Sequence, residues 1–148
     1  MAQGTPCIIA PPTPVRHTIR TVVVDDSPMF LERALRWLKK EPGMEVVGQA
    51  MSGGQALRQV ESLHPDLVIM DLAMAGLNGI QTAKKMKQEK DPPAVILMSV
   101  HDLQAFRKHW IGHVDGVIGK NEFARDLPGI LRSIFPNRVS RGKTSSPL

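Results

Sequence analysis

The stretch Leu67-Val-Ile-Met-Asp-Leu-Ala-Met-Ala-Gly-Leu-Asn-Gly79 decides the fold, because it joins an apolar run to one carboxylate and a glycine-bearing loop. The branched apolar residues of Leu67–Leu72 predict a central strand of a parallel sheet with helices over both faces. A charge at the end of such a strand costs free energy unless it is used, and ligands bind at the carboxyl ends of parallel strands. Asp71 is therefore the candidate reactive group. Taken alone it is better explained as the cap of the next helix, so the rest of the chain must decide between the two roles.

On either side of this stretch, apolar segments alternate with segments that carry apolar residues at helical spacing. Both kinds are bounded by Pro, Gly and Asp residues, which end regular structure. We predict strands at Ile19–Val24, Met44–Ala50, Leu67–Leu72, Ala94–Val100 and Val114–Gly119. We predict helices from Pro28 to the Pro42-Gly43 break, from Ser52 to His64, over Ile80–Glu89, less regularly over His101–Trp110, and from Asp126 onward.

Two prolines indicate where helices begin. Ser27 followed by Pro28 predicts a helix start, because the Ser side chain accepts a hydrogen bond from the first turn and Pro lacks an N–H that would be unsatisfied there. Pro128 is tolerated only in a first turn, so the last helix is predicted to begin at Asp126.

Five strands alternating with five helices predict an α/β protein with a (βα)5 doubly wound, parallel five-stranded sheet. Right-handed crossovers then bring all the strand ends to one edge. The polar residues at those ends are Asp25, Asp26, Asp71, Ser99 and Lys120. Because each of them follows or ends a predicted strand, together they form a candidate site.

These side chains suit phosphoryl transfer. Three crowded carboxylates repel one another, and Mg²⁺, which prefers oxygen ligands, relieves the repulsion and leaves a position for a phosphoryl oxygen. Phosphoryl transfer needs an in-line nucleophile and positive charge around the equatorial oxygens. Asp71 is then the nucleophile, Lys120 and Mg²⁺ supply the charge, and the Ser99 hydroxyl is a donor to the new phosphoryl group.

The ordered set resembles the receiver domain of two-component response regulators, over roughly Thr18–Phe135. The local sequence is also similar, in Val23-Val-Asp-Asp-Ser-Pro28, in Pro65-Asp-Leu-Val-Ile-Met-Asp-Leu-Ala-Met74 and in the Gly79 that closes the loop. The resemblance implies a flavodoxin-like fold. It also implies that Asp71 accepts a phosphoryl group from a phosphohistidine on a sensor histidine kinase or a phosphotransfer protein.

By the same resemblance, Asp26, Asp71 and the backbone carbonyl of Ala73 hold Mg²⁺ directly, and Asp25 helps through water. The chain is then a phosphoacceptor signalling domain, and its only chemistry is its own phosphorylation and dephosphorylation.

Four residues depart from the family pattern. Ala75 stands where a proline is usual in the loop after the acceptor, which loosens the turn. Asn121 replaces the proline, often cis, that follows the lysine, which aims Lys120 less firmly. Val117 replaces the strand-five aromatic of the switch, and Val100 replaces a small residue and is expected to narrow access to the phosphoryl site. The phosphorylation chemistry is expected to be intact and the readout altered.

Composition favours one globular domain at 17–135, with a Pro-rich flexible tail at 1–16 and a basic polar tail at 136–148. The net charge of +5 is spread along the chain without the signatures of nucleic-acid binding, so a solvated surface is favoured over a nucleic-acid site. The chain has no apolar run of about 18 residues and no signal-peptide pattern, which predicts no membrane association and a cytoplasmic location. The single Cys7 is given no role.

The remaining histidines, tryptophans and paired glycines are not predicted to form a metal, cofactor or nucleotide site. His109 and His113 are favoured as solvated histidines over a metal pair, because no acidic or Cys partner lies near them in the sequence. His101 follows the switch position and is assigned no catalysis. Trp37 and Trp110 are favoured as core or partner-facing groups over a cofactor site. The Gly53-Gly54 pair lacks the spacing of a nucleotide-binding loop.

The leading hypothesis is a phosphorylation-dependent switch that acts through a downstream protein or through self-association. One alternative is a pseudo-receiver that docks without phosphorylation, motivated by Ala75, Val117 and Asn121. Another is the receiver part of a longer DNA-binding regulator, in which case nucleic acid becomes a partner. A phosphatase acting on external substrates is disfavoured, because Ala73 stands where a second acid/base carboxylate would be needed.

Overall fold

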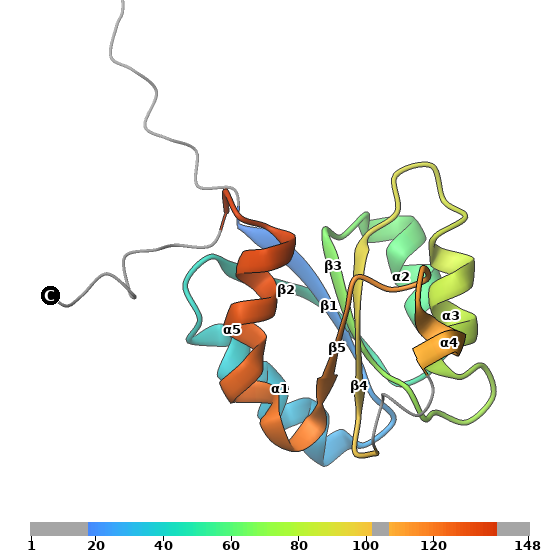
Figure 1. Cartoon of the computed structure of the whole chain (residues 1–148), viewed down its shortest axis with the longest axis horizontal. Helices are drawn as coiled ribbons and strands as arrows, with labels where there is room; N and C mark the ends of the chain where they lie inside the picture. Colours follow the sequence, from blue (N-terminus) through green and yellow to red (C-terminus); the bar gives the residue numbers. More distant parts are fainter. Residues whose placement is uncertain (1–17, 102–106, 139–148) are drawn as a thin grey trace, which may run out of the picture.

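A computed structural model describes residues 18–101 and 107–138 as one five-stranded sheet with helices on both faces (Figure 1). All strand pairs are parallel, and the strand order is β2-β1-β3-β4-β5, which confirms the predicted doubly wound architecture. Each predicted strand is present, with ends that differ by at most two residues. The strands are β1 (Ile19–Val24), β2 (Met44–Ala50), β3 (Leu67–Asp71), β4 (Ala94–Ser99) and β5 (Gly116–Gly119).

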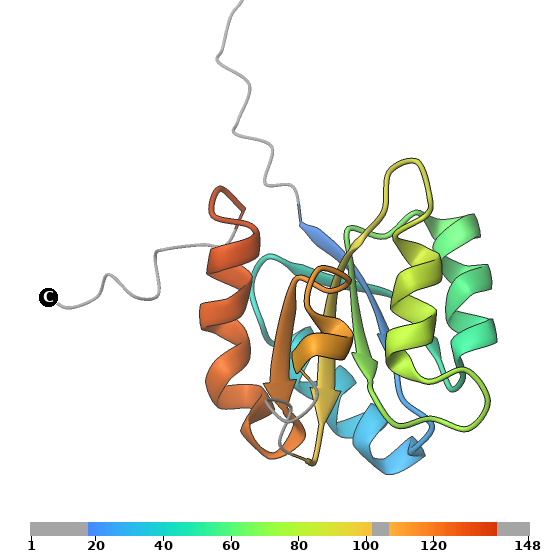
Figure 2. The ribbon, with the colours of Figure 1, turned by 45° about the vertical axis from the view of Figure 1, so that its right-hand side comes forward.

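The helices separate into two layers, which Figure 2 shows from a second direction. Helices α1 and α5 cover one face of the sheet, and α2, α3 and α4 cover the other. Each layer encloses its own apolar core, and β3, which is buried along its whole length, separates the two. The bounds are α1 (Pro28–Lys39), α2 (Gly53–Leu63), α3 (Gly79–Met86), α4 (Arg107–Trp110), the 3₁₀ turn η2 (Lys120–Glu122) and α5 (Phe123–Ile134).

Side-chain caps begin α1, α2 and α3, the helices that follow β1, β2 and β3. Ser27 accepts a hydrogen bond from the Phe30 N–H at 3.3 Å, as predicted, and Pro28 is the first helical residue of α1. Asn78 and Gln81 form a reciprocal capping box at the start of α3. These caps satisfy backbone donors that would otherwise be left free, so they fix where each loop on the functional edge of the sheet ends.

The last helix begins earlier than predicted. α5 starts at Phe123 rather than at Asp126, so Pro128 lies inside the helix. Pro128 costs a backbone hydrogen bond there. The additional turn is compensated by packing, because it carries Phe123 into the core with Leu127 and Leu131, and all three side chains are buried.

Several predictions concern segments outside the described residues. These segments are the Pro-rich tail at 1–16 with Cys7, most of the tail at 136–148, and the first part of the predicted helical stretch, at 102–106. The described part of the second tail contacts the domain, since Arg138 Nη1 lies 3.2 Å from Asp66 Oδ2. Within the described residues, no helix is both long enough and apolar enough to cross a membrane.

Both tryptophans pack against the body of the domain. Trp37 adjoins the α1–α5 core and Trp110 adjoins the α2–α3 core, and both are half-buried. Both residues were predicted to be core or partner-facing groups, and the structure shows them packed at the edge of the two cores.

Candidate functional site

The polar residues predicted at the strand ends do converge. Asp25 and Asp26 follow β1, Asp71 ends β3, and one oxygen from each of these three carboxylates lies within 4.8 Å of the others. Lys120 begins the η2 turn after β5, and Ser99 ends β4 one residue after Met98, the partner of Asp71 in the parallel register. Among the described residues, these three aspartates are the one group of three or more metal-binding side chains.

Backbone N–H groups hold two of the carboxylates. Asp25 is fully buried, and its Oδ1 accepts a hydrogen bond from the Ser27 N–H at 2.8 Å. The Asp71 side chain is 8% exposed, and its Oδ1 accepts from the Ala73 N–H at 3.3 Å. Asp26 is exposed. Each buried carboxylate therefore has one oxygen fixed by the chain and a second oxygen, Oδ2, directed to the centre of the site.

Lys120 bridges the two free oxygens. Its Nζ lies 2.7 Å from Asp25 Oδ2 and 3.3 Å from Asp71 Oδ2, and its side chain is 12% exposed. Although burial alone would lower the pKa of Lys120, the hydrogen bond to Asp25 and the charge of Asp71 outweigh it and raise that pKa. Lys120 is therefore held as a cation.

Asp71 titrates in the opposite environment. Burial raises the pKa of Asp71, and the nearby charge of Asp25 raises it further. Lys120 and the Ala73 N–H oppose this rise without cancelling it. The charge of Lys120 alone therefore does not compensate the carboxylates of this site.

The donor set fits the predicted magnesium ion. Three carboxylates supply hard oxygen ligands within 4.8 Å of one another, and Mg²⁺ is commonly bound by one or two carboxylates together with waters. Asp26 can meet a hydrated ion because it is exposed, whereas Asp25 is already occupied by Lys120 and the Ser27 N–H.

The structure also shows the surroundings of Ser99 and of the three residues that were expected to alter the readout, Val100, Val117 and Asn121. The Ser99 side chain is buried, and its Oγ accepts a hydrogen bond from the His101 N–H at 2.9 Å. Val100 is 62% exposed, so most of its bulk lies in solvent. Val117 is half-buried and packs against the α2–α3 core, so a fixed aliphatic group occupies the position of the usual aromatic. The peptide between Lys120 and Asn121 is trans.

The histidines stay outside this cluster. His101 and His109 are exposed, and His113 is half-buried. His109 lines a separate hollow of about 400 Å³ between α3 and α4, together with Ala73 and Lys84. Neither His109 nor His113 belongs to the group of three metal-binding side chains found among the described residues.

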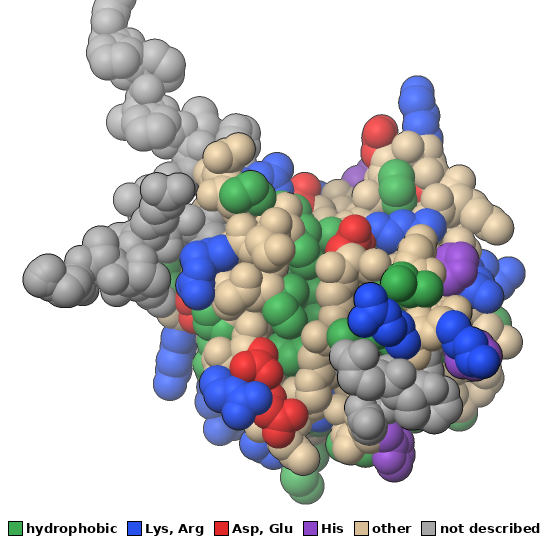
Figure 3. Space-filling view, in the orientation of Figure 1, with side chains coloured by type: hydrophobic (Ala, Val, Ile, Leu, Met, Phe, Trp, Pro, Cys, Tyr) green, Lys and Arg blue, Asp and Glu red, His purple; other side chains and the backbone are tan. Residues whose placement is uncertain are grey.

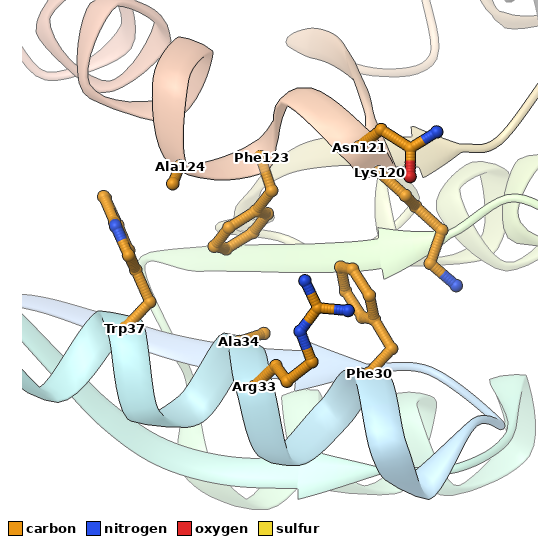
Figure 4. A pocket seen from close by; sticks show the side chains of 8 residues that line it. All are labelled: Phe30, Arg33, Ala34, Trp37, Lys120, Asn121, Phe123 and Ala124. Carbon is orange, nitrogen blue, oxygen red and sulfur yellow. The ribbon is translucent and has the colours of Figure 1, made fainter.

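The aromatic surroundings of Lys120 were not predicted from the sequence. The Lys120 Nζ lies 4.4 Å from the centre of the Phe30 ring, and Phe30 contacts the Phe123 ring edge to face. These residues line a groove of about 210 Å³ between α1 and the start of α5, shown in Figure 4. A signal existed, since Phe30, Ala34 and Trp37 recur at helical spacing along α1.

The charge distribution on one face of the molecule is uneven (Figure 3). Lys, Arg and His side chains gather on the side where α3 and α4 lie. The exposed basic residues of these two helices are Lys84, Lys85, Arg107, Lys108 and His109.

Comparison with known proteins assigns the class. The family described as "Response regulator receiver domain" matches residues 21–132, which is most of the chain. The chain therefore belongs to the response regulator receiver family, and the resemblance found in the sequence is confirmed.

Individual relatives agree with this assignment. The positive alginate biosynthesis regulatory protein of Pseudomonas aeruginosa is 33% identical over 133 residues, which cover 87% of this chain and 52% of that protein. The signal receiver domain of the putative response regulator NarL from Mycobacterium tuberculosis is 29% identical, with a TM-score of 0.72 over 81% of this chain and 95% of that one. A LuxR-family two-component response regulator from Aurantimonas sp. SI85-9A1 is 28% identical, with a TM-score of 0.75 over 82% and 88%.

The chain spans about half the length of the first of these curated relatives, and 21% to 24% of two protein-glutamate methylesterases that it also matches. The shared part is thus the receiver domain. In the methylesterases, that domain belongs to a protein named as an enzyme.

Proposed function

We propose that this receiver domain is a phosphoacceptor switch in which Asp71 takes a phosphoryl group from a histidine kinase or a phosphotransfer protein. The observation that carries the proposal is the position of Asp71: a nearly buried carboxylate at the end of the central strand, 3.3 Å from the Lys120 ammonium and beside two further carboxylates. A cap for the next helix is not needed from Asp71, because Asn78 caps α3.

The chemistry requires one bond to form and one to break. An Asp71 carboxylate oxygen attacks the phosphorus of a phosphohistidine, the new P–O bond forms, and the P–N bond breaks. The leaving imidazole takes the bonding electrons and is protonated. Lys120 stabilises the negative charge on the phosphoryl oxygens, and the Ser99 hydroxyl, now an acceptor for the His101 N–H, rotates its own hydrogen toward the new group.

Asp26, Asp71 and the Ala73 carbonyl would hold Mg²⁺ directly, with Asp25 helping through water, and the ion would supply positive charge to the phosphoryl oxygens. The fixed oxygens of Asp25 and Asp71 keep their carboxylates in place for this purpose, since each already accepts a backbone hydrogen bond.

Phosphorylation would be communicated through the end of β4. A hydrogen bond donated by Ser99 to a phosphoryl oxygen would draw its Oγ, which accepts from the His101 N–H, toward the phosphoryl group and would therefore shift the start of the β4–α4 loop. Because Val117 is packed aliphatic bulk, we expect this output to proceed without an aromatic that swings inward. We propose a protein target or self-association as the output, in the cytoplasm.

Two curated relatives that are longer than the matched segment suggest a second role for this domain. The positive alginate biosynthesis regulatory protein and a protein titled transcriptional regulatory protein DegU both extend well beyond the matched segment. We therefore also propose that this receiver controls a DNA-binding part where one is attached to it.

The test is the intact mass of the protein after incubation with acetyl phosphate, with and without Mg²⁺. We expect one phosphoryl adduct that requires Mg²⁺ and is absent from Asp71→Asn. Labelling of Asp71→Asn to the same extent would contradict the assignment of the acceptor. If neither acetyl phosphate nor a phosphorylated histidine kinase labels the protein, the pseudo-receiver that docks without phosphorylation becomes the better explanation.

A further inference from the structure

We propose that Phe30 is a positioning residue for Lys120: the face of its ring holds the lysine ammonium in the site. The ring contact itself is a property of this structure. Its effect on phosphorylation rests on the proposed function of Asp71.

The contact is short and shielded from water. The Lys120 Nζ lies 4.4 Å from the Phe30 ring centre, inside the distance of about 6 Å at which a cation is attracted to an aromatic face. The Lys120 side chain is 12% exposed, and such contacts strengthen when water is excluded. Three groups therefore surround the ammonium, namely Asp25 Oδ2 at 2.7 Å, Asp71 Oδ2 at 3.3 Å and the ring.

The Phe30 ring is itself held in place. Phe123 packs against it edge to face, with ring centres 5.9 Å apart and planes at 87°. Trp37 also packs edge to face against Phe123, with ring centres 5.4 Å apart. Figure 4 shows Phe30 and Trp37 rising from α1 toward the segment that carries Lys120 and Phe123. The Ser27 cap fixes the backbone of Phe30 through its N–H.

Core packing alone does not account for Phe30. The side chain is half-buried and lines an open groove of about 210 Å³ together with Arg33 and Lys120. A leucine would supply similar apolar bulk at this position, but it has no aromatic face that attracts a cation.

Lys120 needs such a constraint because of its own flexibility. A lysine side chain has four methylene groups and can adopt many rotamers, and Lys120 begins a 3₁₀ turn of three residues rather than a long helix. When a phosphoryl group draws the ammonium away from the carboxylates, the ring remains as a contact that does not depend on their charge. Phe30 therefore limits Lys120 to positions near Asp71 before and after the reaction.

The ring contact is tested in solution without any phosphoryl donor. Protons above an aromatic face have upfield NMR shifts, so we expect the Lys120 Hε protons to be shifted upfield in the wild type. The shift should vanish in Phe30→Leu and persist in Phe30→Tyr, which restores a ring. Trp37→Leu is the matched control, because it removes an aromatic contact of the same cluster on the side away from Lys120, and it should keep the shift. Hε shifts that are the same in the wild type and Phe30→Leu would overturn the proposal.

The consequence is tested by the rate of phosphorylation with phosphoramidate at saturating Mg²⁺. We expect Phe30→Leu to slow the reaction about three- to tenfold, with Phe30→Tyr and Trp37→Leu within twofold of the wild type. The Mg²⁺ concentration for half-maximal rate should be unchanged, since the Phe30 side chain has no oxygen with which to bind the ion.

These measurements separate the two proposals. Loss of the Hε shift in Phe30→Leu at an unchanged rate would refute the positioning role. Equal slowing by Phe30→Leu and Trp37→Leu would show a structural effect of the cluster and would refute it too. A wild-type protein that no donor phosphorylates would refute the proposed function, while the NMR comparison would still decide whether Phe30 holds Lys120.

Discussion

A methyl group added at Gly79 should destabilise the domain and disturb the acceptor site together. Gly79 is the buried first residue of α3, and its N–H donates to the Leu72 carbonyl at 2.8 Å, which closes the loop that follows Asp71. A Cβ atom at this position would lie 2.5 Å from the Asp71 carbonyl oxygen, 2.9 Å from Leu72 Cα and 3.0 Å from a Leu97 methyl group. The first two of these atoms are backbone, so no side-chain rotation relieves the overlap.

The magnitude follows from what can yield. Overpacking costs about 1–3 kcal/mol, and the upper part of that range applies here because β3 is paired with a strand on each side. Alanine gains at most about 1 kcal/mol of helix propensity over glycine. We therefore expect Gly79→Ala to lower the free energy of unfolding by about 2 kcal/mol, or the melting temperature by roughly 8 °C. We also expect slower phosphorylation of Asp71, because its carbonyl must move.

The matched control is Gly54→Ala, another glycine in the first turn of a helix. A Cβ atom there meets one atom, Arg58 Nη1, at 3.7 Å, which is ordinary contact. This variant should be more stable than the wild type by about 0.5–1 kcal/mol. Urea denaturation of the three proteins measures both changes. A Gly79→Ala protein as stable as Gly54→Ala would refute the claim that the loop is packed rigidly against the end of β3.

Three further outcomes are expected. Ser27→Ala should lose about 1 kcal/mol of stability in urea denaturation, because the Phe30 N–H loses its cap, and an unchanged midpoint would contradict this. Asp71→Asn should be more stable than the wild type near neutral pH in EDTA, because burial and Asp25 raise the pKa of Asp71, so its ionisation opposes folding. This difference should shrink as the pH falls through the folded-state pKa of Asp71, and a difference that grows toward acid would reverse the sign of the argument. Mg²⁺ at ten times its dissociation constant should stabilise the wild type by about 1.4 kcal/mol in thermal unfolding. Asp26→Asn, a change at an exposed position, should remove this stabilisation. A rise in melting temperature with Mg²⁺ that persists in Asp26→Asn would argue against Asp26 as a ligand.

The parts of the fold that sequence reasoning captured are those that depend on local signals. The apolar run before Asp71 has no polar residue to face water, so it predicts a strand buried on both faces, as β3 is. Ser27 and Pro28 specify the start of α1 through one side-chain acceptor and one missing donor, and the structure shows both. The convergence of the site residues could be predicted because parallel strands end at the same edge of the sheet. That prediction needs no knowledge of side-chain rotamers.

The parts that escaped prediction depend on contacts between distant segments. Pro128 opposes a helix interior locally, but burial of Phe123 against α1 overrides it, and the sequence around Pro128 carries no sign of that partner. The burial of Asp25 and the exposure of Asp26 are likewise not visible in two adjacent aspartates. That difference appears only in the folded structure, where Lys120, which is distant in the sequence, contacts Asp25.

The contrast between Asp25 and Asp26 explains how the resting site stays folded while short of positive charge. Three carboxylates face one ammonium, which leaves two formal negative charges uncompensated when all four groups are ionised. The buried Asp25 takes the shortest contact with Lys120, and the exposed Asp26 keeps its charge in water, where it costs little. Asp71 is the remaining carboxylate, nearly buried and incompletely paired, and its raised pKa reflects this position. A divalent cation bound beside Asp71 would oppose the burial and the Asp25 charge that raise its pKa, so it would favour the ionised carboxylate that is proposed to react.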